Sequence, residues 1–106
     1  MYEMLIGLNV TDDAVYGRYR ENMKPILHRY GGDFRYDFRV GEVLKSETAE
    51  PINRLFLLVF PDQAARAAFF TDEEYVAVRT EFFDASVGAV TVISEVTREV
   101  SRSDRD

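Results

Sequence analysis

The feature that most constrains the fold is an unbroken apolar run, residues 55–60, that ends at a proline. Leucine, phenylalanine and valine fill all six positions, so a strand here would be apolar on both faces. Strands of this kind are typical of the centre of a sheet that is covered on both sides. After the proline, Asp62 can cap a helix, and Thr71 with Glu74 has the spacing of a capping box. We therefore predict a central strand followed by two short helical segments, the second starting at Thr71.

Three other segments have strand character. Residues 2–10 alternate between apolar and mixed positions, residues 33–40 alternate between apolar and charged side chains, and residues 87–97 are rich in β-branched residues. Between the first two strands, apolar residues at helical spacing indicate an amphipathic helix that ends at Gly31-Gly32. Pro25 lies inside it, so we expect a kink there or an early end.

The resulting order, β-α-β-β-α-β, is that of the ferredoxin-like fold, an α+β class. We expect one domain, residues 1–97, with both helices on one face of a four-stranded antiparallel sheet. Residues 98–106 are predicted to form a polar, disordered tail. The face without helices would expose more apolar surface than monomers usually do, so we expect a homodimer formed through this open sheet face.

Composition narrows the function classes. The chain has 106 residues and a formal charge of −6, which disfavours binding to nucleic acid. It has no cysteine and one histidine, so neither a disulfide nor a typical metal site is expected. We also see no phosphate-binding loop, and we predict neither a cofactor nor a membrane span. A cytoplasmic location is the expectation.

Several motifs together resemble the bacterial family known as domain of unknown function 1330, of the dimeric α+β barrel superfamily. They comprise residues 60–65 and 69–75, Arg79, Tyr16, Tyr19, Tyr30, Gly31, Gly32 and Phe34. The resemblance spans about residues 2–97 and implies the same fold. The family usually has Arg-Gly-Gly soon after the double glycine, whereas here Arg35 and Arg39 compete for that role. The superfamily includes cofactor-free monooxygenases, isomerases, haem enzymes and ligand-binding regulators, so the fold alone assigns no reaction.

Five residues are candidates for ligand binding: Asn9, Tyr19, His28, Arg35 and Arg79. His28 is the only side chain that titrates near neutrality without help, although an ordinary helix-surface residue is the more frequent case. Arg35 is a candidate carboxylate binder, against the alternative of a charged edge strand.

Tyr19 and Arg79 are candidates for the space between the helices and the sheet, where tyrosines more often only fill the core. Asn9 lies near Gly7, a strand glycine that leaves room either for a cavity or for a close partner. The sequence names no catalytic residue.

Two functions follow. In the first, the pocket between sheet and helices binds a small organic molecule, aromatic or carboxylate-bearing, and any chemistry is cofactor-free proton transfer or oxidation. In the second, the protein is a non-catalytic dimeric interaction module without a small-molecule site. A fully packed space between helices and sheet would favour the second.

Overall fold

A computed structural model describes residues 1–99. The strands are β1 (Tyr2–Val10), β2 (Asp33–Arg39), β3 (Arg54–Phe60) and β4 (Val87–Thr97). The helices are α1 (Asp13–Arg29), α2 (Gln63–Thr71), α3 (Glu73–Val78) and α4 (Asp84–Ser86), with a π-helical turn η1 (Arg79–Phe83) between the last two.

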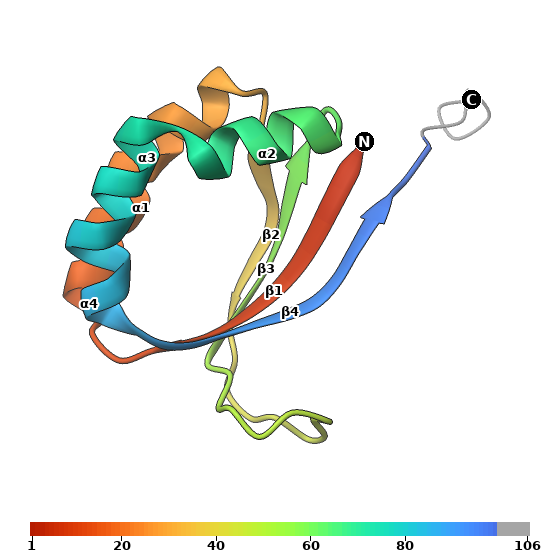
Figure 1. Ribbon diagram of the computed structural model, residues 1–106. Coiled ribbons are helices and arrows are strands. Elements are labelled where there is room, and N and C mark those ends of the chain that lie inside the picture. The colour runs from red at the N-terminus through yellow and green to blue at the C-terminus, as the bar shows by residue number, and fades with distance from the viewer. Residues whose placement is uncertain (100–106) are drawn as a thin grey trace.

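The four strands form one antiparallel sheet in the order β2-β3-β1-β4. All helices lie on one face of this sheet and curve over it as an arch (Figure 1). The core lies between these two layers, where the even-numbered residues of β1 meet buried residues of β3 and α1. This arrangement confirms the predicted ferredoxin-like α+β fold, with a sheet that is open and not closed into a barrel.

The second strand differs from its predicted alternation. Its register against β3 shifts between Phe34 and Tyr36, so Arg35 forms a bulge. Phe34 therefore faces the helices opposite Leu58, whereas Tyr36 lies opposite Leu57 on the other face. The aromatic residues of β2, expected on one face, are divided between both.

The first helix runs through Pro25 without ending there. Asp12 caps its start by accepting a hydrogen bond from the Val15 N–H. At its end, Gly31 has φ of +75° and the Gly32 N–H donates to the Leu27 carbonyl, which is the Schellman arrangement. The glycine pair thus stops the helix as predicted.

The predicted restart of the second helical region lies one residue later than expected. Thr71 is the last residue of α2, and its hydroxyl donates to the Ala67 carbonyl. Asp72 caps α3 instead, because its carboxylate accepts from the Tyr75 N–H at 2.9 Å. A carboxylate is at least as good a cap as a threonine hydroxyl, which favours the later position.

The N-terminus lies beside the end of β4. The backbone of Met1 exchanges two hydrogen bonds with Arg98, one residue beyond the end of β4. Most of the predicted tail, residues 100–106, lies outside the described residues. None of the helices in residues 1–99 is both long and apolar enough to cross a bilayer.

Candidate functional site

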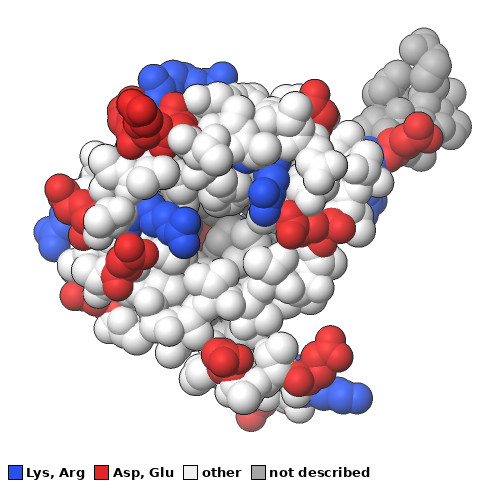
Figure 2. Space-filling model, viewed as in Figure 1, with Lys and Arg blue, Asp and Glu red and all other residues white. Residues whose placement is uncertain are grey.

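A cavity of about 300 Å³ lies between the helical layer and the sheet. Figure 2 shows it as a hollow beneath the helices, bordered by basic side chains. Its wall comes from β1, β3, β4, α1, α2, α3 and η1, with one residue of β2. The lining residues are Met4, Ile6, Leu8, Tyr16, Tyr19, Met23, Phe34, Phe56, Leu58, Arg66, Phe69, Phe70, Tyr75, Arg79, Phe83, Val90 and Val92.

The wall of the cavity is aromatic and apolar, and within residues 1–99 its only charged members are Arg66 and Arg79. None of the lining residues is acidic, although the whole chain carries a charge of −6. The charged side chains of the wall are therefore opposite in sign to the net charge of the protein. Such a wall favours a ligand with an apolar body and an anionic group.

Two tyrosines from different helices meet in the cavity wall. The hydroxyls of Tyr19 and Tyr75 lie 2.8 Å apart in a buried hydrogen bond. Burial raises the pKa of Tyr19 well above its usual 10.0 and also raises the pKa of Tyr75. Both hydroxyls are consequently neutral near pH 7 and act as hydrogen-bond donors or acceptors, not as bases.

Arg66 projects from α2 toward the edge strand β4. Its guanidinium lies 3.2 Å from the carboxylate of Glu95 and 5.1 Å from the ring centroid of Phe70. Glu95 also accepts a hydrogen bond from the Tyr2 hydroxyl at 2.8 Å. The charge of Arg66 is therefore already paired within the chain.

Arg79 is the first residue of the π-helical turn. Its guanidinium carbon lies 5.9 Å from the ring centroid of Phe83, at the other end of the turn. Turns of this type are frequent at functional sites because they alter the direction of side chains in a helix. Across residues 1–99, no carboxylate lies within ion-pair distance of Arg79.

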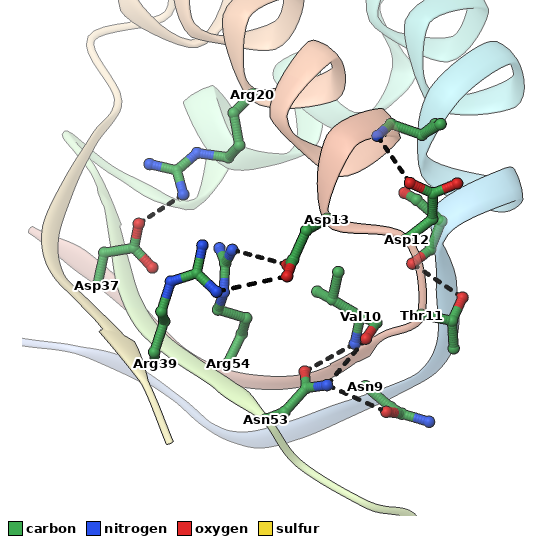
Figure 3. Close-up of polar contacts among 12 residues, drawn as sticks. Asn9, Val10, Thr11, Asp12, Asp13, Arg20, Asp37, Arg39, Asn53 and Arg54 are labelled. Atoms are coloured by element: carbon green, nitrogen blue, oxygen red, sulfur yellow. Dashed lines mark hydrogen bonds and ion pairs between the residues drawn. The ribbon is translucent and has the colours of Figure 1, made fainter. Parts of the chain in front are cut away.

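Of the five candidate residues, Tyr19 and Arg79 line this cavity, and three do not. Asn9 is half-buried on the opposite face of β1, and its side-chain oxygen lies 3.4 Å from Nδ2 of Asn53 (Figure 3). Asn53 also bonds both backbone groups of Val10, which fixes the end of the loop before β3.

His28 and Arg35 are exposed on the surface. The His28 Nε2 lies 3.5 Å from a carboxylate oxygen of Asp33, and Arg35 reaches the sulfur of Met1 at 3.9 Å. Neither side chain lines the cavity.

The other charges of β2 connect the sheet to the first helix. Asp37 pairs with Arg20, and one carboxylate of Asp13 pairs with both Arg39 and Arg54 (Figure 3). The bulge at Arg35 sends its side chain away from this group, so the charges of β2 do not form the single row that their alternation predicts.

The space above Gly7 is filled by the chain itself. A Cβ atom at this position would lie 2.9 Å from Cδ1 of Ile52, in the long loop between β2 and β3. The space beside Gly7 is therefore occupied by a side chain of the same protein. It holds neither a cavity nor a partner sheet, which are the two alternatives that the sequence position predicts.

Sequence reasoning missed Arg66 as a site residue. In the sequence, Arg66 is distinguished only by its position in the short helix α2, where its neighbours are alanines. These small residues leave space for the arginine side chain to reach Glu95 of β4. Among the described residues, no group of three histidine, cysteine or acidic side chains is close enough to hold a metal ion.

Comparison with known proteins agrees with the observed fold. A family model described as Domain of unknown function (DUF1330) matches residues 4–96. No curated protein matches the chain.

Solved structures provide further matches. A protein of unknown function from Rhodopseudomonas palustris, RPA0582, is similar with a TM-score of 0.79 and 17% identity, over 94% of this chain and 83% of that one. A dabb family protein with a ferredoxin-like fold from Mesorhizobium loti has a TM-score of 0.67 and 17% identity, over 93% and 97% of the two chains. A NIPSNAP domain protein from Burkholderia xenovorans has a TM-score of 0.66 and 12% identity, over 93% and 95%. At these identities the likeness concerns the fold alone.

Proposed function

Because the chain belongs to the family described as Domain of unknown function (DUF1330), whose description names no activity, we propose a function from the cavity of this protein. That function is the binding of a small organic carboxylate with an aromatic or otherwise apolar body. The observation that carries the proposal is a cavity of about 300 Å³ whose only charged wall residues are two arginines. Its volume is at the lower end of the range of small-molecule sites.

Binding, and not catalysis by a protein base, is the function that this wall supports. It holds neither a carboxylate nor a histidine, so a bound substrate would lose a proton only to water or to a tyrosinate. Burial raises the pKa of both Tyr19 and Tyr75, which disfavours tyrosinate near neutral pH. We therefore propose cofactor-free proton transfer or oxidation only for ligands that lose their proton without a base from the protein.

The test is a titration with 2-naphthoate, a fluorescent aromatic carboxylate, followed by ligand fluorescence and protein NMR. We expect saturable binding that shifts the amide resonances of α3 and η1. Val90→Trp should weaken it, because Val90 lines the cavity and is 49% exposed, so a large ring there can occupy the opening. Val76→Trp is the matched control, since Val76 is similarly exposed, at 44%, and lies outside the wall. Equal affinity in the two variants would reject the cavity as the binding site.

A second proposal concerns self-association through the sheet face without helices. Tyr36 and Phe38 stack there with ring centroids 5.9 Å apart, yet they are 56% and 51% exposed. They lie beside Leu57 and Leu55 of β3, on the same face. A second copy of the chain supplies the same apolar face, and a two-fold arrangement of two such sheets would cover both.

Native mass spectrometry and light scattering test the dimer. We expect a mass of twice 12.2 kDa for the full chain. Phe38→Asp should give the monomer, because it places a charge on the covered face, whereas Val76→Asp on the helical layer should leave the dimer intact. A monomeric wild-type protein at micromolar concentration would reject this proposal. A dimer that binds no carboxylate would favour an interaction module without a small-molecule site.

A further inference from the structure

We infer that Tyr75 and Arg79 together bind the carboxylate of the ligand, that Tyr19 positions the Tyr75 hydroxyl, and that the ligand is an aromatic monocarboxylate. This inference rests on the proposed function. It assigns the anionic group to Tyr75 and Arg79 and not to Arg66. Four observations support it: helical spacing, an unused hydroxyl proton, an unpaired charge and the chemistry of the remaining wall.

Tyr75 and Arg79 are one helical turn apart. The Arg79 N–H donates to the Tyr75 carbonyl, so the helical path is continuous from α3 into η1. Side chains at this spacing project from the same side of a helix. Both line the cavity, so a hydroxyl and a guanidinium are presented together to one ligand group.

The tyrosine pair has one hydroxyl proton without an acceptor. Each hydroxyl carries one proton, and the hydrogen bond of 2.8 Å between Tyr19 and Tyr75 uses only one of the two. No other acceptor for either hydroxyl occurs among the described residues. Either hydroxyl can be the donor in this bond. When Tyr19 donates, the free proton is that of Tyr75, which lies one helical turn from Arg79, so this arrangement presents a hydroxyl and a guanidinium to the same ligand group.

The two arginines of the wall differ in their charge balance. Arg66 has Glu95 at 3.2 Å, whereas no acid of residues 1–99 pairs with Arg79. One uncompensated positive charge beside an apolar cavity favours one negative charge on the ligand. A dianionic phosphate ester, or a dicarboxylate, would leave a second charge against aromatic rings without a partner.

The rest of the wall specifies the body of the ligand. Besides the tyrosine pair and the two arginines, the wall has methionine and aliphatic side chains and six further aromatic residues: Tyr16, Phe34, Phe56, Phe69, Phe70 and Phe83. Flat aromatic rings pack against such walls through offset and edge contacts. The carboxylate at Tyr75 and Arg79 would fix the orientation of the ring.

The experiment compares 2-naphthoate with its neutral isostere 2-naphthamide and with 2-naphthyl phosphate, in the full chain. Wild-type protein should prefer the carboxylate to both. Arg79→Gln should weaken carboxylate binding by up to about fivefold, because Arg79 is exposed and solvent screens its charge, and Tyr75→Phe should weaken it about fivefold, which is typical for losing one hydrogen bond. Neither variant should weaken amide binding as much. Arg35→Gln, which removes the same charge outside the cavity, is the matched control and should bind like the wild type.

The outcomes separate this inference from the proposed function. If wild-type protein binds neither the carboxylate nor the amide, the proposed function fails and this inference with it. If it binds the carboxylate, but Arg66→Gln abolishes the preference and Arg79→Gln keeps it, only the inference is overturned. A preference for the phosphate would likewise overturn the ligand class alone. Because Arg79 is exposed, Arg79→Gln is not expected to unfold the protein.

The role of Tyr19 has its own readout. With ¹³Cζ-labelled tyrosine, naphthoate should shift the Tyr75 resonance in the wild type. In Tyr19→Phe, the ring remains but the hydroxyl is lost, so the resonance of ligand-free Tyr75 should move and carboxylate affinity should fall about threefold, as for a weak hydrogen bond. An unmoved Tyr75 resonance would show that Tyr19 only packs.

Discussion

The hydroxyl of Tyr30 donates a 2.6 Å hydrogen bond to the carboxylate of Asp72, the residue that caps α3. Tyr30 follows the end of α1, so this contact fixes one helix end against the start of another. The hydrogen bond from Tyr30, and next the backbone N–H of Tyr75, lower the pKa of Asp72 below its ordinary 3.8. Because α3 contains Tyr75 and leads into Arg79, the contact also supports the proposed binding residues.

Removing this carboxylate should destabilise the fold. Asp72→Ala deletes both the cap of α3 and the acceptor for Tyr30, so we expect a lower melting temperature. The stabilisation exists when Asp72 is ionised. Its folded pKa is depressed, so wild-type stability should fall as the pH drops from about 4 toward the folded pKa, and Asp72→Ala should lose less over this range.

Thr71→Ala is the control for this cap. The Thr71 hydroxyl bonds only to carbonyls within α2, so its loss should change the melting temperature little. Thermal unfolding followed by circular dichroism, between about pH 3 and pH 7, measures both effects. A larger loss from Thr71→Ala than from Asp72→Ala would instead support the capping box predicted from the sequence.

The contact between Gly7 and Ile52 should be sensitive to one methyl group. A Cβ at Gly7 would lie 2.9 Å from Cδ1 of Ile52, so Gly7→Ala should cost about 1–3 kcal/mol. Gly17→Ala is the matched control, because nothing lies within 4 Å of a Cβ there, and alanine in a helix should stabilise by about 0.5–1 kcal/mol.

A double-mutant cycle identifies the cause. Ile52→Ala removes the clashing side chain, so adding Gly7→Ala to it should cost much less than in the wild type. Urea unfolding gives the four free energies. Equal costs in both backgrounds would mean that Ile52 does not restrict this position.

The sequence predicts the strands better than it predicts the site. Residues 2–10 and 87–97 have the bounds of β1 and β4, because alternation and β-branched content are local signals. The bulge at Arg35 and the π-helical turn were not predicted, because they depend on how each segment packs against the rest. The wall residue Arg66 was missed for the same reason.

Releasing Arg66 from Glu95 should strengthen carboxylate binding. Glu95→Gln keeps an acceptor for Tyr2 but removes the negative charge that faces Arg66. Both side chains are about one-third exposed, at 33% and 30%, so solvent screens the pair. The gain in naphthoate affinity should therefore not exceed about fivefold and should diminish at high salt. Weaker binding in Glu95→Gln, measured by the same fluorescence titration, would argue against a cationic cavity, and unchanged binding would mean that Arg66 does not act on the bound carboxylate.

The buried tyrosine pair makes the stability of the fold depend on alkaline pH. Burial is the main cause that raises the pKa values of Tyr19 and Tyr75 above 10.0. When the pKa of a tyrosine is higher in the folded state than in the unfolded state, its protonated form stabilises the fold. This stabilisation is complete below the pKa of the unfolded state and is lost as the pH rises from there toward the pKa of the folded state. Above about pH 10 the free energy of unfolding should fall by about 1.4 kcal/mol per pH unit for each tyrosine that the folded state keeps protonated.

Urea unfolding between about pH 8 and pH 11, with tyrosinate absorbance as a second probe, measures this loss. Tyr19→Phe removes one of the tyrosines whose pKa is raised in the fold and should reduce the slope, because phenylalanine has no proton to release in either state. Tyr36→Phe is the control, since Tyr36 is 56% exposed on the opposite face of the sheet and its loss should leave the slope unchanged. A wild-type slope no steeper than that of Tyr19→Phe would mean that the hydroxyl of Tyr19 ionises freely. In that case the hydroxyl of Tyr19 would lie open to solvent and would not hold the buried hydrogen bond that positions Tyr75.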